Sequence, residues 1–207
     1  MSFFRKILPK KEKQPLPKEI EALLFTSSKE QLLDIQDKYI LDAFQINTVG
    51  GTFKSLKEYE LSEKAFLQSI KLLPKYEDPY GNLISLYSSL KQYEKGESIY
   101  RKGMDNSSSK SFIIFHYGRL QFIKGNYPLT LATMKSILNV KDLQHDGVYL
   151  LAIRAAFEMI KTGKDTHNLA TDAMSLWQEG IAKFPESKEL KELAPYFVED
   201  EDLHLFR

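Results

Sequence analysis

Three tyrosines recur at an interval of 34 residues, and this interval is the feature of the sequence that most restricts its fold. Tyr59, Tyr93 and Tyr127 each follow a short, turn-like segment. Seven positions after the tyrosines come the bulky residues Phe66, Tyr100 and Met134. A fixed period of this length indicates tandem copies of one supersecondary unit, which stack because a single copy cannot bury its own apolar faces.

Within each period the apolar residues follow helical spacing. Leu83, Leu86 and Leu90 are three and four positions apart, so they share one face of a helix. A second apolar stripe starts at Ile99 and Tyr100. We therefore expect two helices in each copy, joined by the turn that precedes the tyrosine.

Positions upstream of the tyrosines keep the same period, at Gly50, Ile84 and Gly118. Together with the bulky residues they resemble the tetratricopeptide repeat (TPR), whose hairpins place a small residue where two helices touch closely. The resemblance implies an all-α fold, a right-handed superhelical solenoid of antiparallel helix pairs with N- and C-terminal capping helices. The copies are degenerate, because Ile84, Gln121 and Asp142 stand where the family usually has a small residue, an aromatic residue and proline.

The repeats divide the chain into four predicted regions. Residues 1–18 form a basic, proline-containing flexible arm, and residues 19–42 form capping helices or a degenerate repeat. Four repeats cover residues 43–185, and a capping helix with an acidic tail covers residues 186–207. The predicted bounds of the repeats are 43–76, 77–110, 111–144 and 145–185.

Two local signals refine these regions. The last repeat contains an insertion near residues 161–169, which we expect as an extended loop or as lengthened helices. In the N-terminal cap, Ser28 and Gln31 have the spacing of a capping box, which predicts that a helix begins after Ser28.

Composition narrows the classes of function. The 29 lysines and arginines nearly balance the 28 aspartates and glutamates, so no overall basic charge favours nucleic acid as a partner. The chain contains no cysteine, which excludes disulfides, thiolate catalysis and cysteine-ligated metal sites. The four histidines, His116, His145, His167 and His204, have no partner at the spacing typical of metal ligands. No catalytic motif in the sequence is complete. We therefore expect no enzymatic activity, no metal and no cofactor.

The two ends carry opposite charges and leave alternatives open. Residues 3–13 combine apolar and basic side chains, so this segment is either a solvated arm or a weak contact with an anionic membrane surface. Residues 199–202 are all acidic and precede the apolar stretch 203–206, which is either a solvated tail or a segment that docks onto the protein's own groove. No uncharged apolar run is long enough to cross a bilayer, so the default expectation is a cytoplasmic location.

The resemblance also implies where a ligand would bind, because the first helix of each hairpin lines the concave side of solenoids of this family. The candidate groove residues are Asn82, Phe112, Phe115, His116, Arg119, Phe122, Tyr149, Ile153 and Phe157. Aromatic residues and arginine are the types most enriched at interface hot spots. Core packing explains the aromatics Phe112, Phe115, Tyr149 and Phe157 equally well, and both interpretations stay open. These side chains would then bury against one another, against the loop near Lys161 or under residues 196–198.

One subset of the family grips the C-terminal carboxylate of chaperones with lysine, asparagine and arginine. Only Asn82 matches that pattern here, and Phe112 and His116 replace its last basic pair. We therefore expect an apolar or amphipathic polypeptide segment as the ligand of a protein–protein interaction module, acting as an adaptor, a scaffold or a chaperone-like protein. The alternative is a regulator whose basic arm contacts nucleic acid or membrane while the repeats sense a peptide. Homo-oligomerisation through the solenoid ends also stays open.

Overall fold

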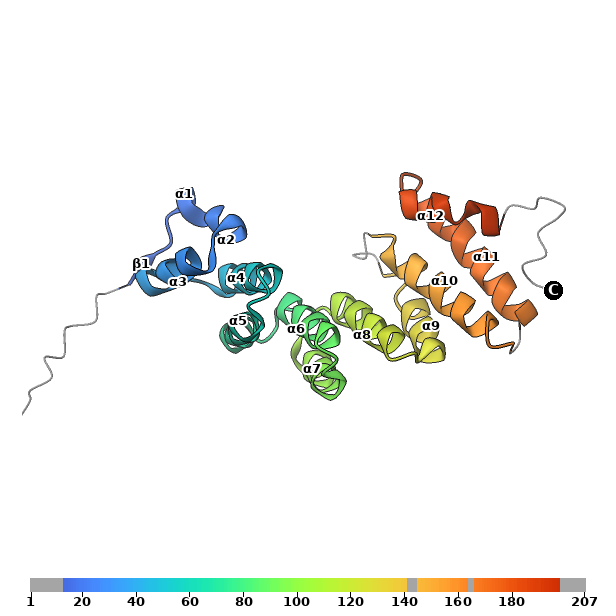
Figure 1. The fold of residues 1–207 in the computed structure, drawn as a ribbon, viewed down its shortest axis with the longest axis horizontal. Helices are drawn as coiled ribbons and strands as arrows, with labels where there is room; N and C mark the ends of the chain where they lie inside the picture. Colours follow the sequence, from blue (N-terminus) through green and yellow to red (C-terminus); the bar gives the residue numbers. More distant parts are fainter. Residues whose placement is uncertain (1–12, 141–144, 164–165, 198–207) are drawn as a thin grey trace, which may run out of the picture. The chain divides into compact units, whose positions relative to one another are not determined.

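The computed structural model describes residues 13–140, 145–163 and 166–197 and divides the chain into two compact units (Figure 1). The N-terminal unit ends at Pro74, and the C-terminal unit begins at Lys75. Nearly all regular structure in the described residues is α-helix, and between residues 43 and 183 the helices pair as antiparallel hairpins. The prediction of an all-α solenoid of helix pairs is confirmed.

The N-terminal unit contains one complete hairpin and the elements that precede it. Its elements are β1 (Gln14–Pro15), α1 (Lys18–Glu21), α2 (Leu23–Thr26), α3 (Lys29–Lys38), β2 (Tyr39–Ile40), α4 (Ala43–Ser55) and α5 (Tyr59–Leu72). The two short strands pair in parallel, with Gln14 opposite Tyr39. Lys13 donates a hydrogen bond to the carbonyl oxygen of Gln36 at 2.6 Å.

The predicted arm 1–18 is therefore too long at its C-terminal end. Backbone pairing between β1 and β2 fixes residues 14 and 15, and α1 already begins at Lys18. Proline did not prevent this, because a two-residue edge strand does not need every backbone N–H group. The predicted membrane contact falls almost wholly on residues 1–12, which lie outside the described residues.

Local capping and a small apolar core hold the N-terminal unit together. The backbone N–H of Ser28 donates to the Gln31 side chain at 2.8 Å, and the Ser28 hydroxyl accepts from the N–H of Gln31, so the predicted capping box is confirmed. α2 packs on α4, where the Thr52 hydroxyl donates to the Leu24 carbonyl oxygen at 2.5 Å. The buried core residues are Leu24, Leu32, Ile35, Leu41, Ile46, Val49, Phe53 and Ala65.

The C-terminal unit stacks three hairpins and closes with two short helices. Its elements are α6 (Asp78–Ser89), α7 (Tyr93–Asn106), α8 (Ser111–Ile123), α9 (Tyr127–Lys135), α10 (Gly147–Ile160), α11 (Thr166–Lys183), α12 (Lys188–Glu192) and the 3₁₀ helix η1 (Ala194–Tyr196). α6 packs on α7 and α8, α9 packs on α8 and α10, and α10 packs on α11.

The period of 34 residues is visible in the turn of each hairpin. Tyr59, Tyr93 and Tyr127 are the first residues of α5, α7 and α9. Two positions before them, the backbone takes a positive φ, with values of 62° at Lys57, 56° at Lys91 and 79° at Gly125. A left-handed residue just after a helix lets the chain reverse while the last helical carbonyls stay hydrogen-bonded. The repeat is thus a repeated backbone conformation as well as a repeated composition.

The last hairpin differs from the others in the length of its second helix. α11 has 18 residues, whereas α5 and α7 have 14 each. Lengthening of this helix therefore accounts for part of the predicted insertion near 161–169, although residues 164 and 165 lie outside the described residues.

The end of α11 is covered by α12 and η1, as expected for a C-terminal cap. Leu190 and Phe197 are buried, and the indole N–H of Trp177 donates to the Leu190 carbonyl oxygen at 2.8 Å. The predicted acidic tail, residues 199–202, lies outside the described residues.

Candidate functional site

Two of the predicted groove residues are part of the core. Tyr149 is 1% exposed and Ile153 is 0% exposed, between α9 and α11. The Tyr149 hydroxyl donates to Glu179 at 2.7 Å, and burial is the main cause that raises the pKa of the phenol. The sequence-based assignment of these two side chains to a partner surface is therefore wrong. α10 is apolar on several faces, so its spacing could not separate the covered face from the open one.

Three other predicted residues mainly join neighbouring helices. The rings of Phe112 and His116 meet edge to face at 4.4 Å, next to Gly81 on α6. Phe115 meets His145 edge to face at 4.5 Å, next to the first turn of α10. Phe112 and Phe115 are partly buried and His116 is buried, which favours the core interpretation for all three.

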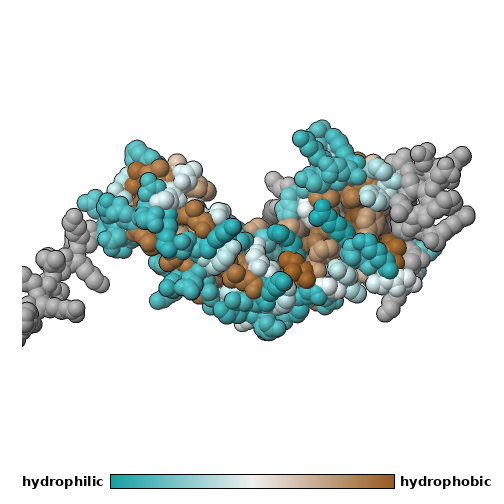
Figure 2. Space-filling model, viewed as in Figure 1, coloured by the Kyte–Doolittle hydropathy of each residue, from teal (hydrophilic) through white to brown (hydrophobic). Residues whose placement is uncertain are grey.

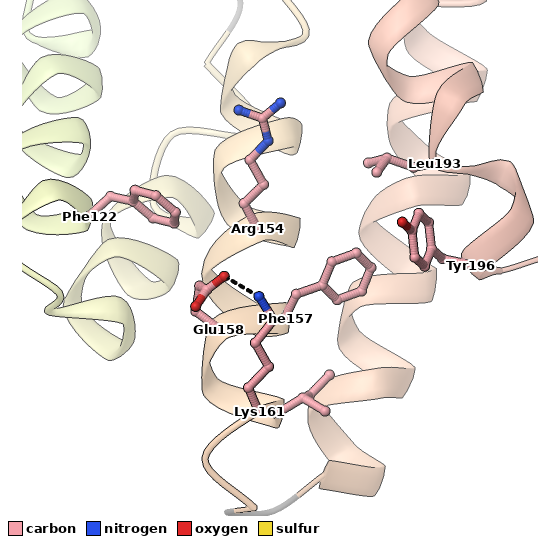
Figure 3. A pocket seen from close by; sticks show the side chains of 8 residues that line it. Phe122, Arg154, Phe157, Glu158, Lys161, Leu193 and Tyr196 are labelled. Atoms are coloured by element: carbon pink, nitrogen blue, oxygen red, sulfur yellow. Dashed lines mark hydrogen bonds and ion pairs between the residues drawn. The ribbon is translucent and has the colours of Figure 1, made fainter. Parts of the chain in front are cut away.

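The remaining two aromatics, Phe122 and Phe157, line an open pocket of about 340 Å³ in the C-terminal unit (Figure 3). Phe122 reaches the pocket from α8, and Phe157 reaches it from α10. The complete lining is Phe122, Arg154, Phe157, Glu158, Ile160, Lys161, Leu193 and Tyr196. This volume lies in the range of about 300–1,000 Å³ that is usual for ligand pockets.

A series of contacts between aromatic rings fixes the C-terminal wall of this pocket. The Phe157 ring lies 5.7 Å from the Tyr196 ring and 5.5 Å from the Phe197 ring. Phe197 stacks in turn on Trp177 at 5.3 Å. Tyr196 is still 45% exposed, so it is held in place and also available to a ligand. Leu193 and Tyr196 were missed by the repeat pattern, because they follow the last repeat.

The charged residues at the pocket are not equivalent. Glu158 and Lys161 form an ion pair at 2.6 Å (dashed in Figure 3), and this hydrogen bond raises the pKa of Lys161. Arg154 is exposed and forms no ion pair with the residues that the structure describes. Figure 3 shows its guanidinium pointing away from the Glu158 and Lys161 pair. The pocket therefore combines apolar walls with one available cation at its edge.

Asn82 and Arg119 lie elsewhere in the C-terminal unit. Arg119 is exposed on α8 and lines a small depression of about 30 Å³, together with His116, Ile123 and three serines of α6. Asn82 is half-buried on α6 and lines neither the depression nor the pocket. The nine predicted residues thus do not form one continuous site.

Across residues 13–140, 145–163 and 166–197, no group of three or more histidine, aspartate or glutamate side chains is placed to hold a metal ion. None of the helices in these ranges has the length and apolarity needed to cross a membrane. On the face shown in Figure 2, apolar residues (brown) reach the surface of the C-terminal unit among polar ones (teal).

Comparison with known proteins identifies the fold. No family model matches the sequence, and no curated protein matches it. Among solved structures, the chain is similar to the crystal structure of the APC/C hetero-tetramer Cut9-Hcn1, a TPR-repeat protein complex, with a TM-score of 0.59 and 10% sequence identity. The match covers 82% of this chain and 32% of that one, so this chain spans about a third of its length. The fold is therefore TPR-like, as the period of 34 residues predicts.

Proposed function

We propose that this protein is a protein–protein interaction module that binds a polypeptide segment in the pocket between α8, α10 and η1. The observation that carries the proposal is the juxtaposition of partly exposed aromatic walls with the available cation of Arg154. TPR-like solenoids are built to present such surfaces, since each hairpin adds one pair of helices to an extended face.

The lining defines the chemistry of the segment. One or two apolar side chains fit between Phe122, Phe157 and Tyr196, where aromatic anchors supply most of the binding energy. A carboxylate next to these side chains fits Arg154, whose guanidinium presents several donors in one plane. The ligand is accordingly an apolar segment with an adjacent acidic residue, bound as an extended peptide or as an amphipathic helix.

The role that follows is that of an adaptor or scaffold, which acts through complementarity without chemical turnover. A chaperone-like role and a cytoplasmic location stay predictions. The alternative regulator depends on the basic arm, of which residues 1–12 lie outside the described residues, so no structural observation favours it.

Selection from a random peptide library tests the proposal. We expect the selected peptides to carry an apolar pair beside Asp or Glu and to bind in fluorescence polarisation. Arg154→Glu replaces attraction by repulsion, and we expect it to weaken binding about fivefold, the effect of roughly 1 kcal/mol at an exposed site.

Arg101→Glu is the matched control, because Arg101 is also an exposed arginine of the C-terminal unit and lines none of the pockets described above. We expect this variant to bind like the unmodified protein. Equal weakening by both variants, or selected peptides without a shared acidic and apolar pattern, would overturn the proposed site.

A further inference from the structure

The pocket lies beside the point where the described chain stops. Leu193 and Tyr196 line it, and Phe197, the last described residue, stacks on Phe157 of the same lining. Ten more residues, 198–207, follow directly. This C-terminal segment is therefore tethered next to the pocket.

The sequence of this segment matches the chemistry of the pocket. Residues 199–202 are Glu-Asp-Glu-Asp, and Leu203, Leu205 and Phe206 follow. Carboxylates complement the guanidinium of Arg154, and leucine and phenylalanine side chains suit walls made by Phe122 and Phe157. The chain thus carries, next to its own pocket, a segment with the properties proposed for an external ligand.

The segment 198–207 is long enough to reach the pocket. The α10 wall from Arg154 to Lys161 is about 10 Å long at 1.5 Å per residue. Five extended residues, 198–202, span up to about 17 Å. The apolar residues from Leu203 onward can therefore turn back and reach any part of the pocket.

We propose that residues 198–207 dock into the pocket of the same chain and compete with the external polypeptide. This inference rests on the proposed function only for the competition, since the docking itself needs no partner. A short tether holds the segment at an effective concentration of about millimolar, so even a contact that is weak between separate molecules fills the pocket for much of the time. An external ligand then binds by displacing the segment, so only a ligand whose affinity outweighs this intramolecular contact occupies the pocket.

Engineered cysteines test the docking directly, because the natural chain contains none. The test pair is Lys161→Cys with His204→Cys, and the control pair is Asp105→Cys on α7 with His204→Cys. In dilute full-length protein under mild oxidation, we expect the test pair to form an intramolecular disulfide about fivefold faster than the control pair, because docking raises the local thiol concentration. Adding Leu203→Asp and Phe206→Asp leaves the tether unchanged and should slow disulfide formation in the test pair severalfold.

An unchanged rate in the test pair after Leu203→Asp and Phe206→Asp would overturn the docking. Equal rates for the two cysteine pairs, or disulfides formed only between two copies of the chain, would also overturn it. Peptide affinity separates this failure from failure of the proposed function. The Leu203→Asp and Phe206→Asp variant, without cysteines, should bind the selected peptides severalfold more tightly than the unmodified protein. Fast intramolecular crosslinking without peptide binding by that variant would refute the proposed function alone, whereas peptide binding with equal crosslinking rates would refute the docking alone.

Discussion

Phe66 lies directly over Gly50, with two ring carbons 2.7 Å from the position that a β-carbon on Gly50 would occupy. The ring is fully buried between α4 and α5, so it has little room to withdraw. We expect Gly50→Ala to lower the free energy of unfolding by about 1–3 kcal/mol, since overpacking forces side chains off their preferred rotamers. Urea denaturation followed by far-UV circular dichroism measures the loss.

Gly51→Ala is the control for this prediction. Gly51 is in the same helix, but no atom lies within 4 Å of the position that a β-carbon on it would take. Alanine is the better helix former, so this variant should gain about 0.5–1 kcal/mol. Equal losses for the two variants would show that the contact between Phe66 and Gly50 is not the cause.

The turn at Lys91 gives a stabilising prediction. Lys91 takes a φ of 56°, a left-handed conformation that costs a residue with a β-carbon about 1–2 kcal/mol. Lys91→Gly should therefore stabilise the C-terminal unit, by about 0.5–1 kcal/mol once the extra freedom of glycine in the unfolded chain is subtracted. Gly125→Ala, at the equivalent turn with φ of 79°, should destabilise it by a similar amount. Urea denaturation followed by Trp177 fluorescence checks both, and opposite signs to these would contradict the repeat-turn account.

Tyr149 predicts a change of stability at alkaline pH. Burial and the hydrogen bond to Glu179 raise the pKa of its phenol above the ordinary value of 10.0. The folded protein then holds this proton at a pH where the unfolded chain has released it. The contribution of Tyr149 to the free energy of unfolding is therefore fully present below about pH 10 and is lost as the pH rises further. Tyr149→Phe removes the ionisable group, and its free energy of unfolding should fall less steeply between pH 9.5 and pH 11.5. Identical slopes for the two proteins would contradict the assigned pKa direction.

The contact between Phe197 and Trp177 predicts a spectroscopic change. Phe197→Ala opens the stack on the only tryptophan of the chain, so Trp177 emission should shift to longer wavelength. Loss of this buried ring should also cost about 3 kcal/mol of stability in the C-terminal unit. Tyr196→Ala removes a neighbouring but exposed ring, and should cost less than about 1 kcal/mol. An unchanged emission maximum in Phe197→Ala would show that Phe197 does not stack on Trp177.

The period predicted the helices and turns because each copy repeats the same local conformation. Tyr59, Tyr93 and Tyr127 begin equivalent helices, and the turn geometry depends only on nearby backbone. The capping box at Ser28 was predictable for the same reason. Signals that act over a few residues survive in degenerate copies.

The candidate site was predicted only in part, because exposure depends on contacts between distant residues. Phe122 and Phe157 were found by their place in the repeat, but Tyr149 and Ile153 are covered by α9 and α11. Arg154, one position after Ile153, was missed because one residue turns an α-helix by about 100°, which is enough to carry a position from the covered side of an apolar helix to its open edge. A variant such as Tyr149→Ala would accordingly report on folding rather than on binding.

The most direct test of the central claim, that the pocket at Arg154 receives a polypeptide ligand, is a double-mutant cycle. It combines Arg154→Glu with a selected peptide whose acidic residue is replaced by lysine, and all four affinities are measured by fluorescence polarisation. If the guanidinium faces that carboxylate, each single change weakens binding and the double change restores part of it, with a coupling energy of about 0.5–1 kcal/mol. Additive losses, with no restoration in the charge-swapped pair, would contradict the account.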